Sequence, residues 1–169
     1  MSVVLDCNIV TCPSLRLKPL AFWFWESEPP MYPNAILSVK NMVALSKETM
    51  AVFLLDDDPS VLKATSRLLD SVGWKVNAFT NPNTFLQHAA THCPDVAILD
   101  ILMPDMNGLE VQARLRLISP STRVIVLTAR DDPSFRQMAM NAGASGFFVK
   151  GVESGEFLAG VKAAAVPIN

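Results

Sequence analysis

The chain changes from an apolar run to a run of acids at residues 53–60, which read FLLDDDPS. Adjacent like charges repel one another unless a cation or bulk water compensates them. Asp58 followed by Pro59 is typical of a helix start, because aspartate caps helices well and proline fits the first turn. Asp56 and Asp57 have no such explanation. We therefore expect them at the end of a buried strand, facing a shared polar site.

The same strand-then-helix pattern occurs five times after Met50. The runs 51–55, 96–99 and 124–127 are apolar without alternation, as expected for strands that are covered on both faces. The expected strands are 51–56, 74–79, 95–100, 123–128 and 145–150. The expected helices begin at Asp58-Pro59, Asn81-Pro82, the sequence MNG at 106–108, Asp132-Pro133 and Ser154. The buried face of the first helix is expected to contain Val61, Ala64, Leu68 and Val72.

Five β-α units in sequence favour an α/β fold with one parallel sheet and helices on both faces. We expect a flavodoxin-like, doubly wound, five-stranded sheet with strand order 2-1-3-4-5 and five helices. Residues 1–49 share no such pattern. We expect them to be a poorly ordered N-terminal extension of unknown role, and residues 50–169 to form the domain. Two interpretations of the extension are open: it docks through Trp23 and Trp25, or Met50 is the natural start.

Composition narrows the class of protein. Half of the residues are apolar, 18% are charged and the net charge is −2, which fits a globular protein and gives no electrostatic case for binding nucleic acid. The apolar run at 20–25 is too short to span a bilayer, and the first ten residues lack the basic start of a secretory signal. We therefore expect a cytoplasmic protein without a membrane segment.

Polar side chains stand at the ends of four of the five expected strands. Asp56 and Asp57 end the first strand, Asp100 the third, Thr128 the fourth and Lys150 the fifth. In open α/β sheets, ligands bind outside the carboxyl ends of the strands, where the winding direction switches. Taken alone, a residue of any of these types at a strand end more often has a structural role than a functional one. Together they predict one site at this edge of the sheet.

From Met50 to about Val166 the chain resembles the receiver domain of bacterial two-component response regulators. The matching stretches are LLDDDPSV, PDVAILDILMPDMNGLE, VIVLTAR and GASGFFVK, in the order and at the spacings of that family. The resemblance implies a phosphoprotein that accepts a phosphoryl group from a sensor histidine kinase or a histidine phosphotransfer protein. Such a domain is not an enzyme in the ordinary sense, because it is both catalyst and substrate.

The resemblance also assigns the acids. Asp100 is the implied phosphoacceptor. Asp57, Asp100 and the backbone carbonyl of Leu102 are the implied ligands of Mg²⁺, and Asp56 acts on the metal through water. Carboxylate and carbonyl oxygens suit this hard cation, which neutralises charge during phosphoryl transfer.

The remaining implied roles concern the switch. Lys150 pairs with Asp100 and then with the phosphoryl group, and Thr128 donates its hydroxyl to that group. Phe147, three residues before Lys150, takes the space that Thr128 leaves; the other interpretation of Phe147 is a plain core residue. The surface expected to change comprises the helix after Pro133, the strand 145–150 and the helix after Ser154. The resemblance also allows for a homodimer through this surface.

Two positions affect the details of the family pattern. Receivers commonly carry proline after the lysine, whereas Gly151 stands here, so we expect a looser loop. Leu102 and Arg130 flank the expected path of an attacking water. An apolar Leu102 cannot orient water, so we expect slow self-dephosphorylation.

Two other functions compete with this one. The first is a receiver-like binding module that is not phosphorylated. The second is a Mg²⁺-dependent phosphohydrolase of the haloacid-dehalogenase type, which also uses aspartate, threonine and lysine at strand ends. Such hydrolases place an acid two residues after the nucleophile, where this chain has Leu102.

Overall fold

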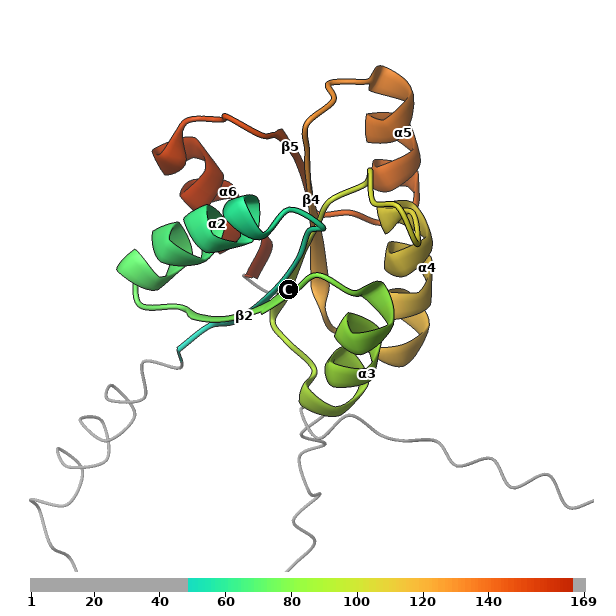
Figure 1. Cartoon of the computed structure of the whole chain (residues 1–169), viewed down its shortest axis with the longest axis horizontal. Helices are drawn as coiled ribbons and strands as arrows, with labels where there is room; N and C mark the ends of the chain where they lie inside the picture. The colour runs from blue at the N-terminus through green and yellow to red at the C-terminus, as the bar shows by residue number, and fades with distance from the viewer. Residues whose placement is uncertain (1–48, 166–169) are drawn as a thin grey trace, which may run out of the picture.

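Strands and helices alternate through the computed structural model, which describes residues 49–165 (Figure 1). The strands are β1 (Ala51–Leu55), β2 (Lys75–Phe79), β3 (Val96–Leu99), β4 (Arg123–Thr128) and β5 (Gly146–Val149). The helices are α2 (Pro59–Ser71), α3 (Pro82–His92), α4 (Gly108–Ile118), α5 (Pro133–Asn141) and α6 (Ser154–Ala165). The expected extension over residues 1–49 lies, apart from Thr49, outside the described residues. Within residues 49–165 no helix has the length and hydrophobicity that a membrane crossing requires.

The five strands form one parallel sheet in the order β2-β1-β3-β4-β5, which confirms the predicted topology. The register places Leu55 beside Leu99, and Leu99 beside Val126. Thr128 pairs with Val149 at the end of β4. The carboxyl ends of β1, β3, β4 and β5 therefore meet at one edge of the sheet, on which the site is built.

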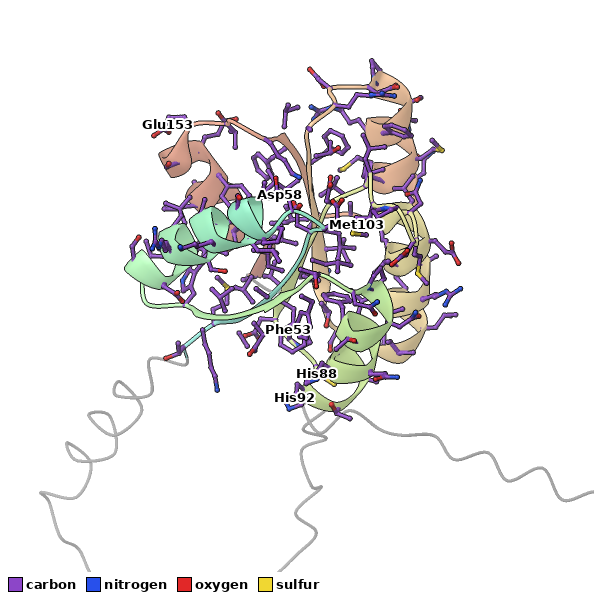
Figure 2. All side chains as sticks on the ribbon, in the orientation of Figure 1. Phe53, Asp58, His88, His92, Met103 and Glu153 are labelled. Atoms are coloured by element: carbon purple, nitrogen blue, oxygen red, sulfur yellow. The ribbon has the colours of Figure 1, made fainter. Side chains whose placement is uncertain are left out.

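Helices cover both faces of the sheet: α2 and α6 lie on one face, and α3, α4 and α5 on the other (Figure 1). Successive residues of a strand point to opposite faces, so Val52 and Leu54 pack with α2 and α6 while Phe53 and Leu55 pack with α3 and α4. Phe53 lies between the sheet and α3, where its ring contacts Phe85 (Figure 2). Burial on both sides explains why these strands are apolar without alternation.

The predicted helix starts are confirmed. Asp58, Asn81, Asn107 and Asp132 are N-caps whose side chains accept hydrogen bonds from backbone N–H groups of the first turn. Because these caps fix where each helix begins, they also fix the short loops that carry the polar residues of the site.

The predicted buried face of α2, which was Val61, Ala64, Leu68 and Val72, is wrong by one residue. The buried residues of this helix are Leu62, Thr65 and Leu69. Because the polar Thr65 occupies a core position, the pattern of apolar residues in the sequence favoured the adjacent face of the helix. Val61, Ala64 and Leu68 instead line a groove that they share with residues near the start of α6, including Phe157.

Candidate functional site

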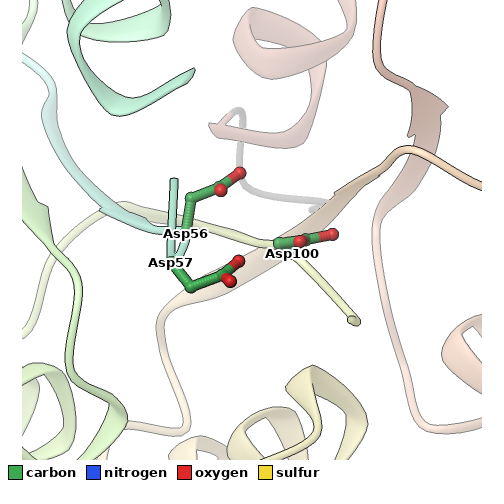
Figure 3. A group of neighbouring side chains, drawn as sticks. All are labelled: Asp56, Asp57 and Asp100. Carbon is green, nitrogen blue, oxygen red and sulfur yellow. The ribbon is translucent and has the colours of Figure 1, made fainter. Parts of the chain in front are cut away.

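Three carboxylates meet where β1 and β3 end. Ligand oxygens of Asp56, Asp57 and Asp100 all lie within 4.8 Å of one another, and Figure 3 shows the three side chains together. Asp56 and Asp100 are buried, with 1% and 4% of their surfaces exposed, whereas Asp57 is exposed. The cluster follows from the pairing of the two strands, because the Asp100 N–H donates to the Leu55 carbonyl at 2.9 Å. The predicted meeting of these acids is thus present in the structure.

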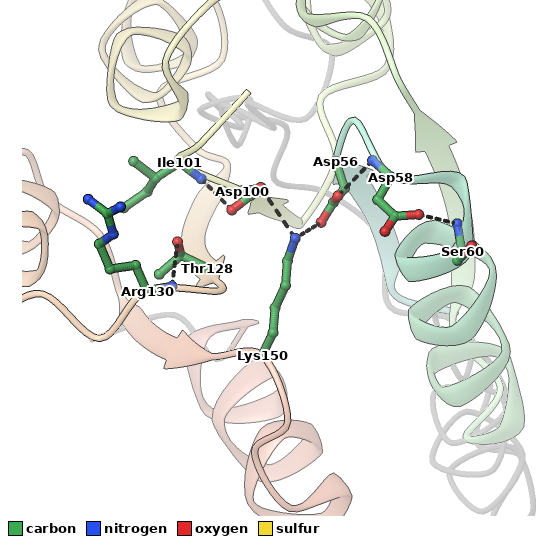
Figure 4. A network of polar contacts seen from close by, with 8 residues as sticks. All are labelled: Asp56, Asp58, Ser60, Asp100, Ile101, Thr128, Arg130 and Lys150. Atoms are coloured by element: carbon green, nitrogen blue, oxygen red, sulfur yellow. Dashed lines mark hydrogen bonds and ion pairs between the residues drawn. The ribbon is translucent and has the colours of Figure 1, made fainter. Parts of the chain in front are cut away.

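Lys150 bridges two of the acids, as Figure 4 shows. Its Nζ lies 2.7 Å from Asp56 Oδ2 and 3.3 Å from Asp100 Oδ2. The pairing with Asp100 was anticipated from the sequence, but the shorter contact with Asp56 was not. The lysine directly follows β5, and its backbone N–H donates to the Thr128 carbonyl at 2.7 Å. Gly151 comes next, with φ 96° and no atom within 4 Å of where a Cβ would stand.

Backbone N–H groups orient the two buried acids. Oδ1 of Asp56 accepts from the Asp58 N–H at 3.0 Å, and Oδ1 of Asp100 accepts from the Ile101 N–H at 2.8 Å. Each carboxylate therefore has one oxygen held by the backbone and the other by Lys150. Asp58 itself serves α2, since its Oδ1 accepts from the Ser60 N–H at 2.8 Å. This capping role was predicted.

Burial is the main influence on the pKa of the Asp56 carboxyl, and it raises that pKa above its usual value. Bonds from Lys150 and the Asp58 N–H lower it in part, and the charge of Asp100 raises it further. Burial alone would lower the pKa of Lys150, but the contacts with Asp56 and Asp100 outweigh it and raise that pKa. Because its folded-state pKa is raised, Asp56 loses stabilisation of the fold as the pH rises through that pKa. A bound cation would offset this loss.

Thr128 ends β4 with no exposed surface. Its Oγ1 accepts from the Arg130 N–H at 3.4 Å (Figure 4). Phe147 is 7% exposed and belongs to the same buried cluster as Ile101 and Val126. Since Ile101 directly follows Asp100, this cluster connects the acid to the aromatic ring.

The loop between β3 and α4 is folded tightly against the acid. The Ile101 carbonyl accepts from the N–H groups of both Met103 and Gly108. A Cβ added at Gly108 would overlap the carbonyl oxygen of Asp100, so this position has room only for glycine. Leu102 lies in this loop with 41% of its surface exposed. In the sequence, the MNG motif indicated only a helix start and gave no sign of this close approach.

The donor set fits a hard divalent cation. Three carboxylates face one ammonium, so the cluster retains negative charge when all groups are ionised. Mg²⁺ and Ca²⁺ take oxygen ligands of this kind, whereas sulfur and imidazole ligands would favour transition metals. Asp56, Asp57 and Asp100 could therefore hold a metal ion.

Comparison with known proteins identifies the family. The response regulator receiver domain matches residues 52–162. The chain belongs to this family. The chain is 33% identical over 134 residues to the response regulator protein TodT of Pseudomonas putida, covering 79% of this chain and 59% of TodT. It is 41% identical over 115 residues to the transcriptional regulatory protein KdpE of Mycobacterium tuberculosis, covering 67% of this chain and 50% of KdpE.

Solved structures agree with this assignment. The receiver domain matches the chemotaxis protein CheY4 of Vibrio cholerae with a TM-score of 0.65 and 27% identity, over 69% of this chain and 98% of CheY4. A CheY-like receiver domain protein from Methanospirillum hungatei matches with a TM-score of 0.66 and 24% identity, over 70% of this chain and 94% of its own, and shares the fold. None of these findings supports a haloacid-dehalogenase-type hydrolase. The chain spans about half to three fifths of the length of TodT and KdpE.

Proposed function

We propose that the receiver domain is phosphorylated on Asp100 in a Mg²⁺-dependent reaction and that this changes a partner-binding surface. The observation that carries the proposal is the group of three acids with Lys150 bridging Asp56 and Asp100. In such a group, a nucleophilic carboxylate stands beside cation ligands and a fixed positive charge. Phosphoryl transfer needs these parts, because it depends mainly on positioning and charge neutralisation.

The metal ligands would be Asp57, Asp100 and the backbone carbonyl of Leu102, with Asp56 acting through water. Bound Mg²⁺ would neutralise charge on the phosphoryl oxygens. Asp57 is exposed at the mouth of the site, and the buried Asp56 already holds Lys150 at 2.7 Å. This difference supports a direct role for Asp57 and an indirect one for Asp56.

Asp100 would attack the phosphorus of a phosphohistidine on a sensor histidine kinase or a histidine phosphotransfer protein. A bond forms between phosphorus and the Asp100 carboxylate oxygen, the phosphorus–nitrogen bond of the donor breaks, and the imidazole leaves with the electron pair. Lys150 would exchange its contact with the Asp100 carboxylate for one with a phosphoryl oxygen. Thr128 would donate its hydroxyl to another phosphoryl oxygen. The chain would thus catalyse its own modification and its slow reversal.

The added charge at Asp100 would draw Thr128 toward it, and Phe147 would report the change at the surface formed by α5, β5 and α6. This surface is where we place a partner or a second copy of the chain. The similarity to a DrrB receiver domain that is activated by BeF3 (29% identity, TM-score 0.62, over 68% of this chain and 96% of that one) supports such a switch. We further propose that residues 50–169 form the receiver unit, that it acts in the cytoplasm, and that it does not itself bind nucleic acid.

The proposal is tested by incubating the chain with Mg²⁺ and a small phosphodonor such as acetyl phosphate, and recording the intact mass. We expect the gain of one phosphoryl group, and no gain when the metal is chelated. A chain that gains no mass under any donor and metal concentration would be the unphosphorylated binding module instead.

Metal binding is expected to depend on Asp57. Asp57→Asn removes one charged ligand, so Mg²⁺ affinity should fall by at least about tenfold, the range seen when supporting groups of metal sites are removed. The measurement is the rise of the thermal unfolding midpoint with Mg²⁺ concentration, because a ligand that binds the folded state stabilises it. Asp58→Asn keeps a capping side chain and should titrate like the wild type. Equal Mg²⁺ titrations for Asp57→Asn and the wild type would contradict the assignment.

The phosphoryl group is expected to last long, because the half-exposed Leu102 side chain cannot hold an attacking water. Leu102→Asn should shorten the half-life several-fold, since an amide can orient water beside Asp100. The decay of the phosphorylated mass after removal of the donor measures the half-life in the wild type and in the variant. A wild-type half-life of seconds would show that another group already positions the water.

A further inference from the structure

One arginine of α5 makes three contacts that join separate segments. The Arg136 guanidinium carbon lies 4.5 Å from the centroid of the Phe147 ring. Its Nη1 donates to the Phe147 carbonyl at 3.4 Å, and its Nη2 lies 3.5 Å from Oδ1 of Asp131 in the loop after β4. A single side chain therefore contacts the ring and backbone of Phe147 in β5 and the loop that begins after Thr128.

The opposite end of α5 is fixed to α4. Gln112 Nε2 donates to the Ala139 carbonyl at 3.0 Å, and Arg116 Nη1 donates to the Ala142 carbonyl at 3.0 Å. These bonds hold the carboxyl-terminal half of α5, while Arg136 stands near its amino-terminal end, close to the loop that carries Asp131. A displacement of that loop would therefore reach Arg136 before it reached the anchored half of the helix.

We propose that Arg136 is a positioning residue of the switch, which holds Phe147 in its buried position and couples it to the loop after Thr128. The inference rests on the proposed function, because the switch matters only if Asp100 is phosphorylated. It adds a residue that neither the sequence pattern nor the acid cluster identifies.

The contacts of Arg136 predict in which direction its loss would shift the position of the Phe147 ring. A guanidinium is attracted to the face of an aromatic ring. Here one of its N–H groups also donates to the backbone carbonyl of the residue that carries the ring. Rotation of Phe147 toward solvent would remove the ring contact. Arg136 thus favours the buried ring, which is the arrangement expected when Thr128 has moved toward a phosphoryl group. Loss of Arg136 should make that arrangement harder to reach.

The chain offers a matched control for this residue. Arg114 on α4 is also half-exposed, with 50% of its side chain accessible against 48% for Arg136, and it forms an ion pair with Glu110 at 2.6 Å. Arg136→Gln and Arg114→Gln each remove one surface charge and one ion pair, but only the first contacts Phe147. Arg136→Lys keeps the charge and loses the planar fork. Circular dichroism and thermal unfolding establish that each full-length variant is folded.

Two measurements test the proposal. The first is the affinity of the Mg²⁺-loaded chain for beryllofluoride, a phosphoryl mimic. It should fall about three- to fivefold in Arg136→Gln, in keeping with a half-exposed cation–aromatic contact, and less in Arg136→Lys. The second is the fluorine resonance of Phe147 in chain labelled with fluorophenylalanine, assigned by its loss in Phe147→Leu. That resonance should shift in Arg136→Gln without any metal or mimic, and Arg114→Gln should match the wild type in both measurements.

An unchanged beryllofluoride affinity and an unchanged Phe147 resonance in Arg136→Gln would overturn the proposal. So would equal changes in Arg114→Gln, because the effect would then be one of overall charge. If the wild-type chain does not bind beryllofluoride, the proposed function fails. The Phe147 resonance of the metal-free variants still decides whether Arg136 holds the ring.

Discussion

Asp100→Asn is expected to abolish phosphorylation of the chain by acetyl phosphate and Mg²⁺. The amide has nearly the shape of the carboxylate, so the loop around Ile101 should keep its fold. The amide lacks the charge and nucleophilicity that attack on phosphorus requires. The substitution also removes one charged ligand of the metal. Intact mass spectrometry should show full labelling of the wild type and none of the variant.

Asp58→Asn is the matched control for this experiment. It makes the same chemical change two residues from the buried Asp56, at a position whose side chain accepts a hydrogen bond from Ser60 and caps α2. Asparagine is an equally good cap, so labelling should persist. Labelling that survives in Asp100→Asn would identify a different acceptor and remove the basis of the proposed function.

Gly108→Ala is expected to be the most destabilising of the conservative substitutions near the site. Its Cβ would overlap the carbonyl oxygen of Asp100, which belongs to the backbone and cannot turn away as a side chain can. Overpacking of this kind costs about 1–3 kcal/mol. For a domain of this size, the midpoint of thermal unfolding should drop by roughly 4–12 °C. Calorimetry or circular dichroism at increasing temperature measures it.

Gly155→Ala provides the comparison. This glycine also lies in the first turn of a helix, but its added Cβ would meet the carboxylate of Glu153, a side chain that can move aside at the cost of its hydrogen bond from the Glu156 N–H. Alanine is the better helix former and partly offsets that loss, so the unfolding midpoint should change far less than in Gly108→Ala. Equal midpoints for Gly108→Ala and the wild type would show that the β3–α4 loop has room that the structure does not display.

Much of the fold could be predicted because its signals are local. The Asp58-Pro59, Asn81-Pro82 and Asp132-Pro133 pairs mark helix starts by the chemistry of two adjacent residues. The buried strands are marked by continuous apolar runs, and each was placed within one residue of its observed bounds. Once the strand order was assumed, the meeting of Asp57 with Asp100 followed from the geometry of parallel sheets.

The features that were missed depend on distances between segments far apart in the chain. The contact of Lys150 with Asp56 depends on how far one side chain reaches across the sheet edge, and residue spacing says nothing of that reach. The closeness of Gly108 to the Asp100 carbonyl is likewise set by a loop's path. The face of α2 was misplaced because Thr65 takes a core position that the apolar pattern assigned to its neighbours. The contact between Arg136 and Phe147 has no sequence signature at all.

Gly151 prevents a simple exchange of the β5–α6 turn with that of receivers that carry proline after the lysine. Its backbone is left-handed, with φ 96°, whereas proline at this place holds φ near −65°. Gly151→Pro would therefore force the backbone out of its observed path, although open space surrounds the residue. The β5–α6 turn of this chain is thus suited to a residue that tolerates a left-handed backbone, and a proline after the lysine would need a turn of different shape.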